Sequence, residues 1–149
     1  MVRTSHSRAE SVRQSFYYAV QGLFTGFSEE RNFRVQCVYG LAVCLLLAWY
    51  QPSAIGCGVA LATVLLLLGA ELANSALERV VDLLSPQAHV SAGEAKDMAA
   101  AGVMLVSFAS AGVVMAVLSS QMKGEAVLGL GGLYLGFFVM KQRWSRRPT

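Results

Sequence analysis

Two long stretches of this chain carry no charged residue, and this limits the folds open to it. Residues 54–70 and 98–118 contain no Asp, Glu, Lys or Arg, and two shorter apolar runs cover residues 35–50 and 126–140. A helix needs about 20 apolar residues to cross a bilayer, with a lower limit near 17. The two long runs are therefore predicted membrane spans. The two shorter runs need polar flanks or local thinning of the bilayer to cross.

The composition supports residence in a membrane. Hydrophobic residues make up 55% of the chain and charged residues 14%, whereas soluble domains have roughly 45–50% and about 25%. These values exclude an ordinary soluble domain, and the chain is too hydrophobic to be disordered. The net charge of +3 is mild, and the chain shows no basic–aromatic patch or zinc-ligand spacing. We therefore predict no nucleic-acid partner.

The positions of the basic residues indicate how the apolar runs cross. If the N-terminus is cytoplasmic and all four runs span, all but Lys123 of the 12 Lys and Arg residues lie inside. The positive-inside rule favours this topology over three spans, which would leave the basic C-terminal end outside. We predict an all-α integral membrane protein with three parts. These are a cytoplasmic segment with an amphipathic surface helix (1–34), a transmembrane core (35–122) and an extra C-terminal apolar helix with a basic tail (123–149).

The N-terminal segment has the periodicity of an amphipathic helix. Phe16, Val20, Leu23 and Phe27 follow the spacing i, i+4, i+7, i+11, which places them on one helix face. A basic helix with an aromatic face is typical of helices that lie on a membrane surface. Packing of this face against the other helices is an equally good alternative and is compatible with a surface position.

Acidic residues cluster just after the run 54–70. Glu71, Asn74, Glu78 and Asp82 follow the spacing i, i+3, i+7, i+11, so a helix presents them as one stripe. Glu71 directly follows the uncharged run, and an ionisable group so near the bilayer indicates a functional site. Asp82 lies farther from the run, and an ordinary solvated helix face is the alternative for this residue.

A short loop, expected at 85–94, would bring Lys96 and Asp97 back to the level of the acidic stripe. Two or more carboxylates suit a divalent cation, and a lysine suits phosphate. A carboxylate beside an apolar region is suited to take a proton from an alcohol. These parts predict transfer of a phosphoryl group from a nucleotide to a membrane alcohol. The chain has neither a P-loop nor the motif set of soluble kinases, so such an enzyme would be of a different build.

Two separated motifs resemble the prokaryotic diacylglycerol kinase family, which includes the undecaprenol kinases. One motif is ELANSALERVVD at 71–82, followed by His89 and by AKDMAA at 95–100. The other is EERNFR at 29–34, preceded in the same order by Ser15, Phe16, Ala19, Gly22 and Phe27. The resemblance covers about residues 11–120. The run 126–140 and the basic end after it are extra to the usual short form of the family.

The resemblance implies a homotrimer in the bacterial inner membrane that uses ATP and Mg²⁺. Each subunit would have a surface helix and three spans, and the active sites would lie between subunits on the cytoplasmic side. Glu71 would be the general base on the lipid hydroxyl, and Glu30 and Glu78 would bind the magnesium ion. From the residues alone, Glu30 would be taken for an ordinary surface acid.

The resemblance also assigns the remaining polar residues of the motifs. Asn74 would position the reacting groups, Lys96 would contact phosphate, and Asp97 would contact the nucleotide or order the site. Asp82 and His89 would belong to the nucleotide site. Arg13, Gln21 and Gln36 are further candidates.

The lipid substrate and one competing function stay open. The segments 30–34 and 96–102 resemble the undecaprenol-kinase branch somewhat more than the strict diacylglycerol branch, which favours undecaprenol slightly. The competing function is a small proton-coupled multidrug exporter that uses a membrane-embedded glutamate. In such a transporter the acid would lie mid-span and apart from other acids, whereas here the acids cluster at a helix end near Lys96.

Overall fold

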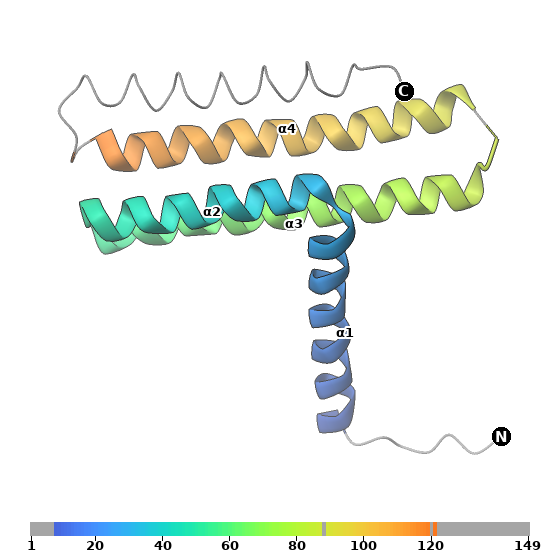
Figure 1. Ribbon diagram of the computed structural model, residues 1–149, viewed down its shortest axis with the longest axis horizontal. Coiled ribbons are helices and arrows are strands. Elements are labelled where there is room, and N and C mark those ends of the chain that lie inside the picture. The colour runs from blue at the N-terminus through green and yellow to red at the C-terminus, as the bar shows by residue number, and fades with distance from the viewer. Residues whose placement is uncertain (1–7, 88, 120, 122–149) are drawn as a thin grey trace.

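The computed structural model describes residues 8–87, 89–119 and 121. In these residues the chain forms four α-helices: α1 (Arg8–Glu29), α2 (Arg31–Tyr50), α3 (Ala54–Leu84) and α4 (Val90–Ser119). Helices α2, α3 and α4 run alongside one another, and α1 leaves this bundle sideways (Figure 1). The prediction of an all-helical chain is confirmed for the described residues.

Three of the described helices, α2, α3 and α4, are long and apolar enough to cross a membrane. Helix α2 begins at Arg31 rather than at the start of the run 35–50, so a polar first turn extends the helix to 20 residues, long enough to cross. Helix α3 continues without a break from the apolar run 54–70 through the acidic stripe, Glu71 to Asp82. The predicted fourth span, 126–140, lies outside the described residues, so the four-span topology stays a prediction.

The connections between the helices are short. The chain turns at Glu30, whose extended backbone (φ −97°, ψ 111°) separates α1 from α2. A three-residue turn separates α2 from α3, and Ser53 begins α3 by accepting a hydrogen bond from the Gly56 amide at 3.1 Å. The loop expected at 85–94 is wrong in its length, because α4 already begins at Val90. Helix α4 starts early because His89 accepts backbone N–H groups of the first turn through its carbonyl and its Nδ1.

The core joins all three long helices at the end of the bundle away from the acidic residues. It consists of six buried side chains, two from each helix: Val43, Leu47, Ala60, Val64, Val114 and Leu118. Nearer the middle, hydroxyl groups link the same helices. The fully buried Ser110 donates to Thr63 at 3.2 Å and shares a hydrogen bond of 3.2 Å with the hydroxyl of Tyr39. These contacts fix α2 and α4 against α3.

Helix α2 approaches α3 most closely at Gly40. A Cβ added there would lie 2.9 Å from Cγ1 of Val64, whereas one at the exposed Gly58 would meet nothing within 4 Å. We expect Gly40→Leu to lower the free energy of unfolding by about 1–3 kcal/mol, because a packed interface must shift to admit it. Gly58→Ala is the control, and it should be neutral or slightly stabilising. Unfolding in mixed micelles of rising SDS content measures both, and equal stability of the two variants would contradict the close approach.

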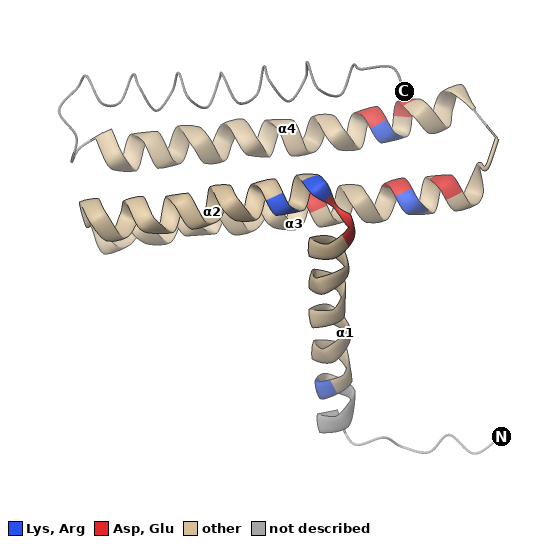
Figure 2. Ribbon diagram, in the orientation of Figure 1, with Lys and Arg blue, Asp and Glu red and all other residues tan. Residues whose placement is uncertain are grey.

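The aromatic face of α1 does not pack against the rest of this chain. Phe16 and Phe24 are 72% and 69% exposed, and Leu23 and Phe27 are also exposed, while Val20 is half-buried. Of the two alternatives for this face, the exposure favours contact with a membrane surface over packing within the subunit. Charged side chains gather where α1 meets the bundle and toward the α3–α4 loop, and the opposite halves of the three long helices are uncharged (Figure 2).

Candidate active site

Glu71 is buried between the helices, with 2% of its surface exposed. Helix α3 carries it, and the amide of Gln36 on α2 donates from Nε2 to its Oε2 at 2.8 Å. A buried carboxylate is costly unless it is hydrogen-bonded, so this contact both stabilises and orients the side chain. Gln36 is itself 7% exposed. The two helices thus hold one carboxylate in a fixed position at the edge of the apolar bundle.

One turn farther along α3, Asn74 donates from Nδ2 to Oε1 of Glu78 at 2.8 Å. Within the described part of the chain, two buried side-chain oxygens have no hydrogen-bond partner, Oδ1 of Asn74 and Oε1 of Gln36. Buried polar atoms are nearly always satisfied, so two unsatisfied acceptors beside a buried carboxylate need an explanation. Both are suited to a hydroxyl donor or a cation from outside the chain.

These polar groups line one end of a cleft of about 550 Å³ between α2, α3 and α4. The polar end is lined by Asn32, Gln36, Glu71, Asn74 and Glu78. The rest of the cleft is mainly apolar and includes Val35, Leu46, Met104, Val114 and Met115. An apolar cleft with a few convergent polar groups is typical of a binding site for a small molecule.

The bend between α1 and α2 is tied to α3 by one guanidinium group. Nη2 of Arg79 lies 2.7 Å from Oε1 of Glu30 and 3.0 Å from Oε2 of Glu29. Arg79 directly follows Glu78 on α3. Its contact therefore holds Glu30, which is predicted to bind metal, beside α3. The sequence reasoning did not single out Arg79, because its two partners lie 49 and 50 positions away.

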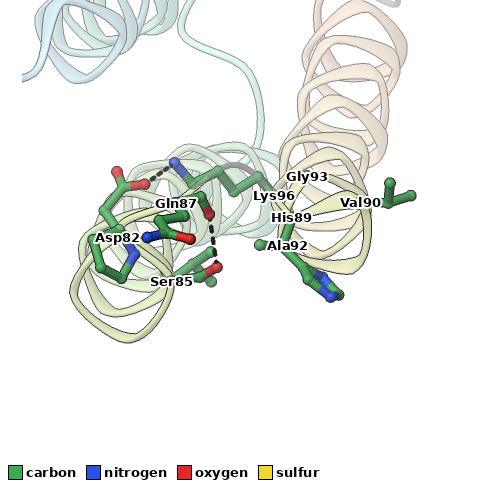
Figure 3. A pocket seen from close by; sticks show the side chains of 10 residues that line it. Asp82, Ser85, Gln87, His89, Val90, Ala92, Gly93 and Lys96 are labelled. Atoms are coloured by element: carbon green, nitrogen blue, oxygen red, sulfur yellow. Dashed lines mark hydrogen bonds and ion pairs between the residues drawn. The ribbon is translucent and has the colours of Figure 1, made fainter.

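Lys96 and Asp82 meet across the α3–α4 hairpin. The lysine Nζ donates to Oδ1 of Asp82, and the two side chains point toward one another (Figure 3). They line a pocket of about 490 Å³ to which His89 also contributes. The hydrogen bond from the Ser91 amide to His89 Nδ1 gives this histidine a role at the start of α4. Asp97 is exposed on α4 next to Lys96.

The predicted site residues therefore form three small groups. Glu71, Asn74 and Glu78 lie together with Gln36, Glu30 is paired with Arg79, and Asp82 is paired with Lys96. Within the described ranges, no three His, Cys, Asp or Glu side chains lie close enough to form a metal site. The oxygens of Glu30, Glu78 and Asn74 are nonetheless the hard donors that Mg²⁺ prefers. Gln36 was named only as a further candidate through the resemblance, and its contact with Glu71 was not predicted. Its place as a polar residue inside an apolar run is the signal that could have pointed to it.

Comparison with known proteins identifies relatives of this chain. The family model described as "Prokaryotic diacylglycerol kinase" matches residues 17–118. A diacylglycerol kinase of Synechocystis is 39% identical over 103 residues, which cover 68% of this chain and 59% of that protein. The diacylglycerol kinases of Haemophilus influenzae and Escherichia coli are 34% and 33% identical over 88 residues, covering 59% of this chain and 75% and 72% of those proteins.

The matched region contains all the candidate site residues named above except Arg13. It also covers the three helices that are able to span a membrane, apart from the last residue of α4. The chain spans about three fifths of the Synechocystis relative. The family model nevertheless covers more than half of this chain. The chain therefore belongs to the prokaryotic diacylglycerol kinase family.

Proposed function

We propose that this chain is a membrane lipid kinase that transfers the γ-phosphoryl group of ATP to the hydroxyl of a lipid alcohol. The reaction would depend on Mg²⁺ and would take place at the cytoplasmic face of a bacterial inner membrane. The relatives are named diacylglycerol kinases, which supports this class of reaction. A proton-coupled exporter, the competing function, is not supported by membership of this family.

The observation that carries the proposal is the buried Glu71 at the polar end of an apolar cleft. A lipid alcohol has matching chemistry, with an apolar body and one hydroxyl donor. The body fits the apolar lining, and the hydroxyl donates its hydrogen bond to the Glu71 carboxylate at the polar end of the cleft. A phosphate acceptor is thereby placed in a fixed orientation, which is a large part of catalysis by positioning.

Glu71 acts as the general base in this proposal. Its carboxylate takes the hydroxyl proton as the lipid oxygen attacks the γ-phosphorus, and the bond from that phosphorus to the bridging oxygen of ADP breaks. Gln36 keeps the carboxylate oriented through its 2.8 Å hydrogen bond. Lys96 contacts the phosphates, and Asp82, His89 and Asp97 complete the nucleotide site near the α3–α4 loop.

The residues present fit a magnesium ion. Glu30 and Glu78 would hold it, and the buried, unsatisfied Oδ1 of Asn74 is a further oxygen donor beside Glu78. When bound, Mg²⁺ would neutralise negative charge on the phosphates. The protein groups supply the orientation, since the Glu78 carboxylate is fixed by Asn74 and Glu30 is fixed at the bend between α1 and α2.

The substrate and the assembly are parts of the same proposal. Two motif segments favour undecaprenol slightly, whereas the relatives carry the name diacylglycerol kinase, so both alcohols belong in the test. A homotrimer would cover part of the large apolar surface of the long helices, on which Trp49 and Leu65 are 83% and 68% exposed. Bilayer lipid would cover the remainder.

The direct test supplies the purified protein in detergent micelles with γ-labelled ATP, Mg²⁺ and either diacylglycerol or undecaprenol. We expect labelled lipid phosphate with at least one alcohol, and its formation should stop when a chelator removes the metal. Absence of labelled lipid with both alcohols would contradict the proposed function.

A further inference from the structure

The guanidinium group of Arg79 already binds one carboxylate of the proposed metal site, that of Glu30. Arg79 directly follows Glu78 on α3, and its guanidinium binds both Glu30 and Glu29. The side chains of Arg79 and Glu29 are 45% and 62% exposed, and that of Glu30 is 28% exposed. Ion pairs with this exposure are weak, so the pairing can be exchanged for another.

A divalent cation and Arg79 compete for Glu30. In the proposed function Glu30 and Glu78 bind Mg²⁺, and a guanidinium 2.7 Å from the Glu30 carboxylate would lie beside that ion. Like charges repel at such distances, and here the repulsion is modest because the side chains are partly exposed to solvent. Arg79 therefore lowers the affinity of the site for the metal as long as it stays on Glu30.

The phosphates that accompany the metal offer Arg79 a new partner. Phosphates bound near Glu30 and Glu78 would lie close to Arg79, which follows Glu78 on α3 and contacts Glu30. Guanidinium groups bind phosphate through two parallel hydrogen bonds, which are stronger than an exposed pair with a carboxylate. The loss of the carboxylate partners is thus offset by the gain of phosphate.

We propose that Arg79 exchanges partners in the catalytic cycle, from the carboxylates of Glu29 and Glu30 that it contacts in this structure to the nucleotide phosphates when metal and nucleotide bind. This inference rests on the proposed function. It assigns Arg79 two roles, as a competitor of the free metal and as a ligand of the nucleotide. A purely structural Arg79 would only hold the bend between α1 and α2 against α3, and its loss would weaken metal binding.

The test measures metal binding in the absence of nucleotide. Mn²⁺ is titrated into the full chain in micelles, and free Mn²⁺ is followed by electron paramagnetic resonance for the wild type, Arg79→Gln and Arg31→Gln. Arg31→Gln is the matched control, because it removes the same charge from the same bend and leaves the Arg79 pairs intact. We expect Arg79→Gln to lower the Kd for Mn²⁺ by roughly two- to fivefold, the strength of an exposed ion pair. The control should stay close to the wild type.

Nucleotide affinity should change in the opposite direction. We expect Arg79→Gln to raise the KM for ATP about tenfold or more, the effect of a lost hydrogen bond to a charged group. Arg79→Lys keeps the competing charge, so its Mn²⁺ affinity should match the wild type while its KM for ATP lies in between. Mn²⁺ affinity that is unchanged, weaker or undetectable in Arg79→Gln, or an unchanged KM for ATP, would overturn the exchange. Absence of lipid phosphate from the wild type would refute the proposed function instead, whatever the Mn²⁺ titration shows.

Discussion

Glu71→Gln is expected to lower the rate of phosphate transfer to the lipid by about 10²–10⁴-fold, the usual contribution of a general base. Glutamine has the shape of glutamate and still accepts the hydrogen bond from Gln36, so the cleft is preserved. It cannot take the proton of the lipid hydroxyl. The loss should therefore appear in kcat, with little change in the KM for ATP, because the nucleotide groups lie toward the α3–α4 loop.

The measurement is the initial rate of labelled lipid formation at saturating ATP and lipid. A neutral amide is also easier to bury than a carboxylate, so the variant should resist SDS unfolding as well as the wild type does. Gln36→Leu is the companion variant, because it keeps the carboxylate and removes the group that orients it. We expect about a tenfold loss there, as for one hydrogen bond to a charged group. Full activity of Glu71→Gln would show that another group accepts the proton.

Glu78→Gln should reduce kcat/KM about 100-fold at a fixed Mg²⁺ concentration, because one of the two proposed metal ligands loses its charge. The new side chain still accepts the hydrogen bond from Asn74, so local packing is retained. The half-maximal Mg²⁺ concentration should rise, and part of the activity should return at high Mg²⁺. Metal titrations of the lipid kinase activity measure both effects.

Glu94→Gln is the control for charge alone, since Glu94 is an exposed acid on α4 that has no assigned role. It should leave the Mg²⁺ dependence unchanged. An unchanged Mg²⁺ requirement in Glu78→Gln would contradict the assignment of Glu78 as a metal ligand. A residue other than Glu78 would then have to bind the metal together with Glu30.

The membrane helices could be read from the sequence because burial in lipid excludes charge over a whole span. The ends of these helices could not be predicted in the same way. Arg31 and Arg34 make the first turn of α2 polar, so the apolar pattern does not include it. The early start of α4 was missed for a different reason. It depends on His89 accepting N–H groups of the next turn, and histidine is not among the usual residues at helix starts.

The acidic stripe was predictable because its members lie on one helix and helix geometry fixes their spacing. The pairing of Arg79 with Glu30 joins residues far apart in the chain, and no local pattern encodes it. Glu30 itself has the sequence context of a surface acid, and only the resemblance to the family pointed to it. The hydrogen bond from Gln36 to the buried Glu71 likewise follows from how α2 packs on α3. Hydrophobic periodicity alone does not specify that packing.

The most direct test of the central claim asks whether the lipid hydroxyl itself receives the phosphoryl group. Wild-type protein in micelles is given γ-labelled ATP and Mg²⁺ with diacylglycerol, with undecaprenol, or with the methyl ether of each alcohol. The ethers keep the apolar body and lack the hydroxyl proton that Glu71 is proposed to take. We predict labelled lipid from at least one free alcohol and none from its ether. No label in either alcohol, or equal label with and without the hydroxyl, would contradict the account.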